Sequence, residues 1–435
     1  MFTMWFGETP VVLINDVPTM LETFVKDGEA YAGRPKMEHS FSGEFNLGLE
    51  GDYWRDHRRF SLQVLRNFGL GRNLMQERVL HEVVELIDHV KAEIKAGNEN
   101  VDMMAIVDIC VGSIINSLTF GYSFDKKDKE GFHKLKTLAG QLIANFLDPL
   151  WKICLWNPNL MKYIPPFDKV YKRVESTEKS LNQIFHEKIK AHREKIDFES
   201  DEEPRDYAEA FLRHQYKLKK DGIKDDKFSD NQLVAMATGL WVAGQETTSS
   251  TLAWLILYMM EHQDIQKKAH DELDKHIGSD RLVTLDDKTN LNYINAIVAE
   301  ILRFSNLSSV NVFHRLTKEV QIHGYTFPEN TTITYQIPFV LHDSRYFDEP
   351  EKFKPERFLD KNGKFFWPQE LMTFGIGKRA CLGEGLAKLE LYLFAANILN
   401  QFKLNHPKDK KADLTRIIDL VTAPIPYKTF VESRF

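Results

Sequence analysis

Apolar residues recur with helical spacing along most of this chain. Positions three and four apart are repeatedly apolar, as expected of helices that bury one face or their whole surface. The stretches with this pattern are residues 52–66, 73–96, 102–119, 168–195, 205–219, 229–262, 264–275 and 291–304. A further helix is predicted from about Gly383, because Leu386, Leu389 and Phe394 continue the same spacing. The chain is therefore predicted to be mainly α-helical.

Short strand-like segments predict a small β region. The opening residues alternate in polarity around a turn at residues 7–10 and resume as Val11 to Ile14, which predicts a hairpin. Further strands are expected at Val320 to Ile322, Thr331 to Tyr335 and Val421 to Phe430. The β region is therefore expected to draw on both ends of the chain.

Composition and charge exclude some classes of protein. With 435 residues, 43% of them hydrophobic, the chain can bury a large core. Its formal net charge of -6 gives no reason to expect nucleic-acid binding, which usually shows as a basic domain. Cys110, Cys154 and Cys381 are too few and too scattered for a disulfide framework, which fits a reducing compartment.

No secretory signal or spanning helix is predicted at the start of the chain, because charge, Gly and Pro occur within its first ten residues. The longest apolar stretches, Leu233 to Gly244 and Thr251 to Met260, are separated by Gln245 and Glu246. Neither reaches the roughly 18 to 20 residues that cross a bilayer.

Residues 374–385, FGIGKRACLGEG, have the composition of a thiolate ligand loop. A cysteine thiolate is favoured by nearby cations and by the positive end of a helix, and Lys378, Arg379 and the helix after Gly383 supply both. The glycines at 375, 377 and 383 allow the backbone to turn sharply and to lie against a flat ligand. The alternative is a buried structural cysteine beside an ordinary Gly-rich turn.

The pattern Phe374-Gly375-x-Gly377-x-Arg379-x-Cys381-x-Gly383 resembles the haem-binding signature of the cytochrome P450 family. The resemblance implies a mainly α fold with a small β region, in which haem lies between a long oxygen-activating helix and the helix after the cysteine loop. Cys381 would be the axial ligand of the haem iron, and Phe374, Arg379 and Gly383 would contact the cofactor. Residues 1–435 would form one haem-thiolate monooxygenase domain.

The start of the chain differs from that of microsomal members of this family. Those members begin earlier, with an apolar anchor helix, a Pro-rich hinge and a first helix. The chain is therefore expected to be N-terminally truncated relative to the family and to lack the membrane anchor.

The longest apolar helical stretch contains Ala243, Gly244, Glu246 and Thr247, a sequence that resembles the family's oxygen-activating element. Small residues at 243 and 244 would leave room beside the helix for a diatomic ligand. An acid and a hydroxyl next to that space suit proton delivery to bound O2, so Glu246 and Thr247 are the expected catalytic residues. The alternative is a polar kink in a core helix, in which Thr247 bonds back to a carbonyl.

Trp54 and Arg58 lie one turn apart on a predicted helix and match the family's Trp-x-x-x-Arg element. Both side chains are hydrogen-bond donors suited to carboxylates, and the propionates of haem are carboxylates. The alternative is an ordinary packing pair on the helix. Residues 51–75 hold five arginines against two aspartates. This basic strip is either a solvated face or a docking surface for an acidic redox partner.

Glu300 and Arg303 form a routine i, i+3 pair when considered alone. Together with Arg357, in the segment Pro355 to Phe358, they resemble the family's buried Glu-Arg-Arg cluster, which implies a structural role. His314 occupies the region where family members place a propionate-contacting residue. A histidine satisfied within the core is the alternative for His314.

By position, the resemblance places substrate contacts in five largely apolar segments, which predicts a hydrophobic guest. They are Phe41 to Leu49, Leu142 to Trp151, Leu240 to Thr247, Asn306 to Val312 and Val421 to Ile425. An apolar run lies around Pro149 and Pro158 and is either core or a loop that enters a membrane. Its members are Phe146, Leu147, Leu150, Trp151, Ile153, Leu155 and Trp156.

The resemblance implies a monooxygenase that inserts one atom of O2 into a xenobiotic, fatty acid or steroid-like molecule. Electrons would come from NADPH through a flavoprotein reductase at the cytosolic face of the endoplasmic reticulum membrane. One alternative is a haem-thiolate isomerase or dehydratase of lipid peroxides, which the pair Glu246 and Thr247 disfavours. The other is a haem-binding sensor or carrier without turnover.

Overall fold

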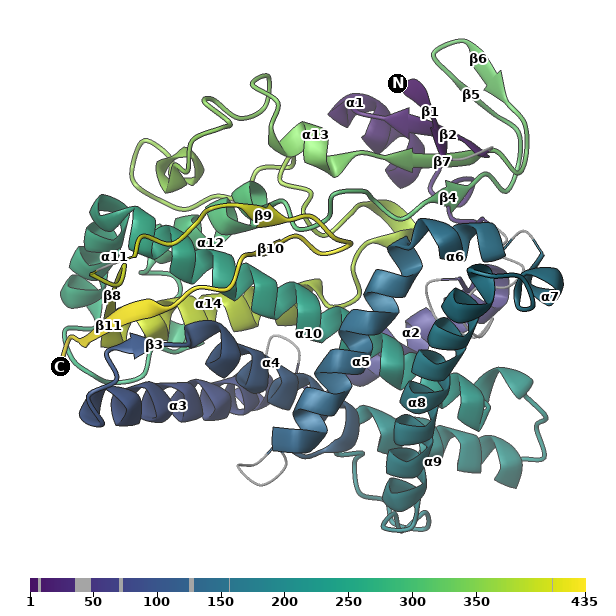
Figure 1. The fold of residues 1–435 in the computed structure, drawn as a ribbon, viewed down its shortest axis with the longest axis horizontal. Helices are drawn as coiled ribbons and strands as arrows, with labels where there is room; N and C mark the ends of the chain where they lie inside the picture. The colour runs from purple at the N-terminus through teal and green to yellow at the C-terminus, as the bar shows by residue number, and fades with distance from the viewer. Residues whose placement is uncertain (7–8, 36–47, 70–72, 125–128, 156, 409) are drawn as a thin grey trace. The chain divides into compact units, whose positions relative to one another are not determined.

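The computed structural model describes residues 1–6, 9–35, 48–69, 73–124, 129–155, 157–408 and 410–435. The fold is mainly helical, as the apolar spacing predicts (Figure 1). The longer helices are α2 (Gly51–Asn67), α3 (Asn73–Lys95), α4 (Met103–Phe120), α5 (Lys129–Leu147), α8 (Phe167–Arg193), α9 (Tyr207–Lys220), α10 (Asp230–Glu261), α11 (Gln263–His276), α12 (Asn292–Ser305) and α14 (Glu384–Gln401). The short ones are α1 (Val17–Met20), α6 (Pro149–Cys154), α7 (Pro158–Met161) and α13 (Ile337–Leu341).

Each helix predicted from apolar spacing is present, with ends within about two residues of the prediction. The predictions omit α5, whose sequence contains Gly131 and Gly140. Glycine lowers helix propensity, so the local signal is weak. Packing of α5 against α8 provides the tertiary stabilisation that the propensity of α5 does not predict.

The strands are β1 (Phe2–Phe6), β2 (Thr9–Ile14), β3 (Asn100–Val101), β4 (His314–Arg315), β5 (Val320–Ile322), β6 (Tyr325–Phe327), β7 (Thr332–Tyr335), β8 (Phe402–Asn405), β9 (Arg416–Ile417), β10 (Ala423–Pro424) and β11 (Thr429–Ser433). They confirm a small β region built from both ends of the chain. The prediction of one strand from Val421 to Phe430 is wrong. Two separate strands, β10 and β11, occupy this region, and Pro424 and Pro426 lack the N–H groups that a continuous ladder needs.

The chain divides into two compact units. The first comprises residues 1–35, 71–110 and 246–435, and the second comprises residues 36–70 and 111–245. The helices α4 and α10 each contribute residues to both units.

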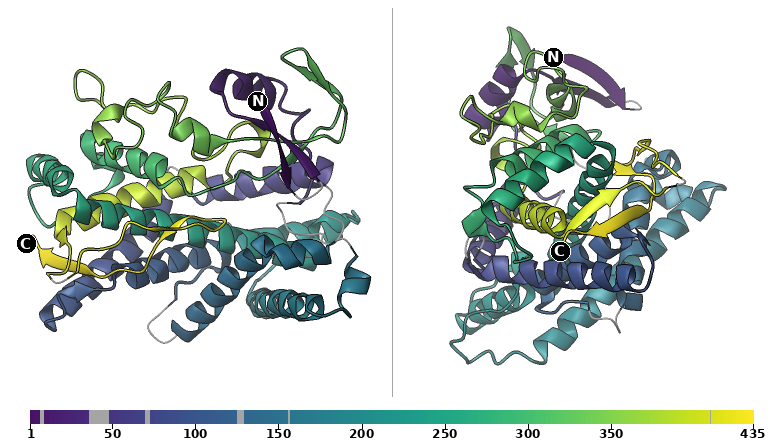
Figure 2. Two further views of the ribbon diagram at one scale, coloured as in Figure 1. Left: turned by 45° about the horizontal axis from the view of Figure 1, so that its top comes forward. Right: turned by 90° about the vertical axis from the view of Figure 1, so that its left-hand side faces the viewer.

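In the first unit, α14 lies at the centre of a helical layer and contacts α3, α11 and α12. Its last thirteen residues, from Leu389 to Gln401, are all buried. Strands β3, β11 and β8 form a sheet, and β8 continues directly from α14 (Figure 2). This packing fixes α14, and with it the loop that leads into the helix.

A second sheet in the first unit has the order β1-β2-β7-β4. Its central pair is parallel, with Val12 opposite Ile333, and β4 pairs with the other edge of β7. The apolar side chains of β2 and β7 pack into a core that also includes Phe24 and Leu371. The sheet therefore joins the start of the chain to the segments around His314 and the cysteine loop.

In the second unit, α8 packs against α5, α6 and α9, and α2 packs against α9. The side of α2 that faces this unit is aromatic: Phe60 lies 5.6 Å from Phe211 and 5.4 Å from Phe228, measured between ring centroids. These contacts hold α2 so that its other side carries the basic residues.

Candidate functional site

The cysteine loop is a sharply turned backbone held by hydrogen bonds. The backbone N–H of Cys381 donates to the carbonyl of Phe374 at 2.8 Å, which closes the loop just before α14 begins at Glu384. Gly375 and Gly377 have φ of 77° and 70°, in the left-handed region that favours glycine. The loop therefore presents Cys381 from a fixed turn.

The two glycines also allow close backbone contacts. A Cβ added at Gly377 would lie 1.9 Å from the carbonyl oxygen of Phe24, and one at Gly375 would lie 2.8 Å from the hydroxyl of Tyr335. Gly383 differs, because its φ is -92° and an added Cβ would meet nothing within 4 Å. Within the protein, the turn therefore depends on Gly375 and Gly377, and the predicted contact of Gly383 with a flat ligand stays a prediction.

The three cysteines lie in different environments. Cys110 and Cys154 are buried, and burial raises the pKa of both thiols, which disfavours the thiolate. Cys381 is exposed and lies three residues before the N-terminal end of α14, where the helix dipole favours a negative charge. Of the cations expected near it, Lys378 is exposed and its ammonium lies 3.1 Å from the carboxylate of Glu29. Arg379 is therefore the better candidate to favour the thiolate.

Arg34, His314 and Arg379 form a cluster of hydrogen-bond donors in the same unit. Arg34 Nη1 donates to the carbonyl of Phe313 at 2.8 Å, and Arg379 Nε donates to the carbonyl of Ala32 at 2.9 Å. Arg34 is only 7% exposed, and burial lowers its pKa to about 10. Both arginines help to lower the pKa of His314. A concentration of positive charge in a buried place suits anionic groups such as carboxylates.

His314 is a buried ring with one defined hydrogen bond. Its Nδ1 lies 2.7 Å from the carbonyl oxygen of Tyr31, so this nitrogen must carry the proton. Burial, Arg34 and Arg379 hold the pKa of His314 well below its usual value, and the ring is neutral at pH 7. Nε2 of the neutral ring is then an acceptor and does not donate to a carboxylate.

Sequence reasoning missed Arg34, because a lone arginine before a proline has no recognisable pattern. Only the tertiary structure brings it to His314: Gly33 forms a β-bridge with Arg315. A Cβ at Gly33 would lie 2.6 Å from the carbonyl oxygen of Arg315, which shows how closely the two segments approach.

The polar segment of α10 lies within one continuous helix, Asp230–Glu261. The hydroxyl of Thr251 donates to the carbonyl oxygen of Thr247 at 2.8 Å. Glu246 and Thr247 are partly exposed within a helix whose C-terminal half is otherwise mostly buried. Within the partly exposed side chain of Glu246, the carboxylate oxygen Oε1 is itself buried.

Ala243 and Gly244 differ in what lies beside them. Ala243 is exposed, although its neighbours Trp241 and Val242 are buried. A Cβ at Gly244 would lie 2.9 Å from Cδ1 of Ile115 on α4, so the space there is filled by a side chain. The prediction of open space beside the helix therefore applies to Ala243 and is wrong for Gly244, which allows α4 to pack closely.

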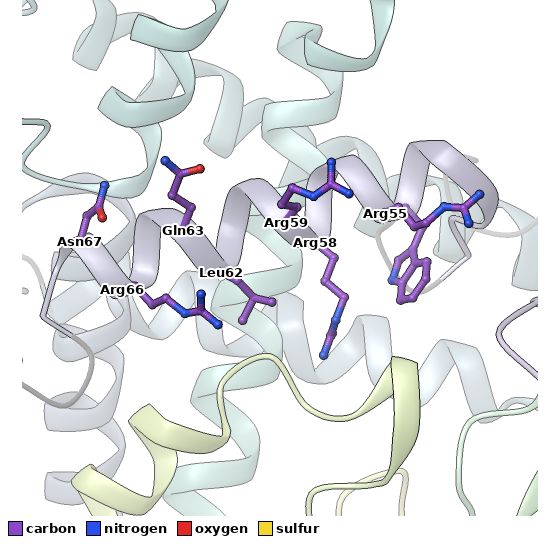
Figure 3. Close-up of a pocket in the computed structure, with 8 residues that line it drawn as sticks. Arg55, Arg58, Arg59, Leu62, Gln63, Arg66 and Asn67 are labelled. Carbon is purple, nitrogen blue, oxygen red and sulfur yellow. The ribbon is translucent and has the colours of Figure 1, made fainter. Parts of the chain in front are cut away.

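Trp54 and Arg58 share one side of α2, as their spacing predicts. Trp54 is 7% exposed, and the guanidinium carbon of Arg58 lies 6.0 Å from its ring centroid. A surface cavity of about 520 Å³ extends along this helix, and Figure 3 shows Arg58 and Gln63 extending to opposite sides of α2. The residues that line it are Trp54, Arg55, Arg58, Arg59, Leu62, Gln63, Arg66 and Asn67.

Glu300, Arg303 and Arg357 meet in the interior of the first unit. The carboxylate of Glu300 accepts hydrogen bonds from Arg303 Nε at 2.7 Å and Nη2 at 2.8 Å, and from Arg357 Nε at 3.3 Å. The Glu300 and Arg303 side chains have no exposed surface. Arg303 also donates to the carbonyls of Leu341 and Pro350. The cluster therefore ties α12 to the segments before the cysteine loop.

Two of the predicted substrate segments are held together in the first unit. The N–H of Thr422 donates to the carbonyl of Leu307 at 2.7 Å, and the indole of Trp254 on α10 donates to the carbonyl of Thr422 at 3.1 Å. Residues 41–47 of another predicted segment lie outside the described residues.

The apolar run around Pro149 is partly core and partly surface. Trp151 and Cys154 are buried in a small cluster with Val170 and Val174. Several large apolar side chains of α6, α7 and the turn that follows are exposed: Leu150, Ile153, Leu160, Tyr163 and Ile164. Trp156 and the side chains of Phe146 and Leu147 lie outside what the structure describes. Within the described ranges, α4 is the helix long and apolar enough to cross a membrane, and 72% of that stretch is buried in the protein.

Comparison with known proteins extends over nearly the whole chain. The family model described as Cytochrome P450 matches residues 1–431. Cytochrome P450 2C38 of Mus musculus is 33% identical over 434 residues, which cover 98% of this chain and 86% of the relative. Cytochrome P450 2U1 of Bos taurus is 32% identical over 440 residues, covering 100% of this chain and 78% of the relative.

Proposed function

The chain belongs to the cytochrome P450 family and is a haem-dependent monooxygenase, and from this premise we propose that Cys381 is the axial ligand of its haem iron. We further propose that the substrate is a hydrophobic small molecule and that electrons come from NADPH through a flavoprotein reductase. Because the family match spans residues 1–431, we also propose that residues 1–435 form one haem-thiolate domain.

The observation that carries the assignment of Cys381 is its position at the start of α14. It is the exposed cysteine, whereas burial raises the pKa of the other two thiols. The hydrogen bond from its N–H to Phe374 and the left-handed glycines fix the direction of the side chain. A thiolate held in this way suits a soft axial ligand of haem iron.

The donor set in the first unit also fits haem. Haem presents two carboxylates besides its iron, and the buried Arg34 and the partly buried Arg379 are suited to bind them by charge-assisted hydrogen bonds. His314, neutral at pH 7 with Nδ1–H on Tyr31, would orient this cluster and would donate to a propionate only if it became protonated. On the second unit, Trp54 and Arg58 are proposed to bind propionate as well.

When bound, haem supplies the iron at which O2 is activated. The residues of α10 are proposed to deliver protons to O2. Ala243 offers a small, exposed surface, and Glu246 and Thr247 carry an acid and a hydroxyl that can hold and pass a proton toward O2. The pair also disfavours the isomerase or dehydratase alternative, which needs no proton delivery to O2.

The α2 surface is proposed to receive the reductase. Arg55 and Arg59 are exposed, and each lies next to an aspartate one turn earlier on the helix. Asp56 is also paired with Lys227, so its charge is shared between two cations. The surface thus keeps a net positive charge, which would attract an acidic flavoprotein and increase its association rate at low salt.

The chemical class of the substrate and the cellular location of the protein are inferred from apolar surfaces. The two segments joined by Thr422 and Leu307 lie beside α10 in the first unit and would contact a hydrophobic guest. The exposed side chains of α6 and α7, such as Leu160 and Tyr163, would rest on a membrane surface. These features support peripheral association with the cytosolic face of the endoplasmic reticulum.

The absorption spectrum of the haem-loaded protein, reduced and treated with CO, tests the proposal. A thiolate ligand moves the Soret band to long wavelength, so the parent and a Cys154→Ala control should show the shifted band and Cys381→Ser should lack it. The parent should also consume NADPH when a flavoprotein reductase is present. A Cys381→Ser protein with the shifted band would refute the ligand assignment. A shifted band without NADPH consumption would favour the isomerase or the sensor.

A further inference from the structure

Glu390 is a buried acid in the middle of α14 whose role the proposed function does not explain. Its side chain is 3% exposed and shares a hydrogen bond with Thr248 of α10, which is 4% exposed. A carboxyl group in a helix interior is costly to bury, and an apolar residue would cost less. The hydrogen bond is thus a specific contact between two helices of the first unit.

The protonation state of Glu390 determines what this contact can do. Burial raises its pKa to about 8, and the hydroxyl of Thr248 is the one partner that opposes the shift. No charged group among the described residues contributes to it. At pH 7 the carboxyl group is therefore neutral and can donate as well as accept a hydrogen bond.

The two ends of this hydrogen bond belong to the helices that hold the proposed site residues. Thr248 directly follows Thr247, and α14 begins three residues after Cys381. In this part of α10 the Thr251 hydroxyl occupies the carbonyl of Thr247, so a side chain shares in the local helix bonding. The hydrogen bond from Thr248 to Glu390, on a different helix, would hold this turn of α10 in place.

We propose that Glu390 is a positioning residue that, through Thr248, fixes Glu246 and Thr247 relative to the Cys381 loop. The inference rests on the proposed function. Without this contact the turn at residues 246–251 would open more often, and protons would reach O2 in the wrong place. More of the O2 consumed would then take up two electrons and two protons and leave as hydrogen peroxide. Correspondingly less would take up four of each to form water.

Two variants of Glu390 separate positioning from simple stability. Glu390→Gln keeps a neutral group that can donate to Thr248, whereas Glu390→Leu keeps the approximate size but removes every hydrogen bond. Replacing a buried acid by leucine is not expected to lower the thermal midpoint at pH 7. Thr248→Val removes the partner hydroxyl while preserving its shape, and the double variant with Glu390→Leu tests whether both act through one contact.

The main measurement is hydrogen exchange of the amides of residues 246–251 in the haem-loaded proteins, with α12 as an internal reference. Losing the contact should speed exchange there about tenfold in Glu390→Leu and Thr248→Val, and no further in the double variant. Glu390→Gln should resemble the parent. A second measurement, the peroxide formed per O2 consumed with NADPH, reductase and no organic substrate, should rise in Glu390→Leu and return toward the parent in Glu390→Gln.

The CO spectrum of each protein distinguishes a failure of the proposed function from a failure of the role proposed for Glu390. A parent without the shifted band would contradict the proposed function before Glu390 is considered. If the parent and Glu390→Leu both show the band and do not differ in exchange at residues 246–251, the positioning role is refuted and the proposed function stands. Equal acceleration of exchange in α12 would also refute it, because the effect would then be global.

Discussion

At the scale of single residues, Gly377 shows why the cysteine loop has a glycine. Its φ of 70° is unfavourable for any residue with a Cβ, and the carbonyl of Phe24 lies where that Cβ would be. Gly363 has nearly the same φ, 72°, but nothing within 4 Å of an added Cβ. The two positions therefore separate backbone strain from steric overlap.

We expect Gly363→Ala to lower the free energy of unfolding by about 1 kcal/mol, because alanine is strained in the left-handed region. Gly377→Ala should cost a further 1 to 3 kcal/mol or so, since the backbone of Phe24 must move away. Urea unfolding of both variants measures the difference. Equal losses would mean that the loop relaxes without disturbing Phe24.

At the scale of elements, α12 is joined to its surroundings by the cluster of Glu300, Arg303 and Arg357. The Glu300–Arg303 pair has no exposed surface, and its shortest contact is 2.7 Å. On α11, Lys267 and Asp271 form a pair of similar length, 2.6 Å, in which both side chains are more than half exposed. The two ion pairs are similar in length and differ mainly in burial, so comparing them measures how burial changes the contribution of an ion pair to stability.

Glu300→Ala should lower the free energy of unfolding by about 3 to 5 kcal/mol, because it leaves buried arginines without their carboxylate. Asp271→Ala should change it by less than about 1 kcal/mol, since exposed pairs are screened by water. Equilibrium urea denaturation of the two variants gives both values. A Glu300→Ala protein as stable as the Asp271→Ala control would contradict the structural role of the cluster.

At the scale of the whole molecule, stability depends on pH through groups with shifted pKa values. Glu390 has its pKa raised from 4.5 to about 8 by burial. Between these values the folded protein holds a proton that the unfolded chain releases, so the free energy of unfolding falls as pH rises. Burial lowers the pKa of His270 from 6.5 to about 4, which acts in the opposite sense, but only below about pH 6.5.

Burial also raises the pKa of Glu178, to about 7, so the parent loses stability through both acids between pH 6.5 and 8, and comparison with Glu390→Gln isolates the contribution of Glu390. There, each pH unit should lower the stability of the parent by up to about 1.4 kcal/mol through this group. Glu390→Gln cannot lose a proton, so its stability should fall by roughly 2 kcal/mol less over the interval. Urea denaturation at several pH values compares the two slopes, and parallel slopes would show that Glu390 does not titrate there.

The helices and the family motifs could be predicted from sequence because they depend on local spacing. Apolar periodicity predicts helices such as α10 and α12, and the motif around Cys381 combines glycines, a cation and a helix start within twelve residues. Residues whose role depends on a distant segment could not be predicted in this way. Arg34 and Glu390 carry no local pattern that distinguishes them, and the motif that contains Gly244 does not indicate that Ile115 fills the space beside it.

The sequence by itself therefore determined the helical class and the family, and it indicated the cysteine that we propose as the iron ligand, because each follows from residues close together in the chain. The tertiary structure decided which groups surround them. It brought Arg34 to His314, filled the space beside Gly244 with Ile115 and joined Glu390 to Thr248. Such contacts depend on how distant segments pack and on burial, which local spacing does not encode.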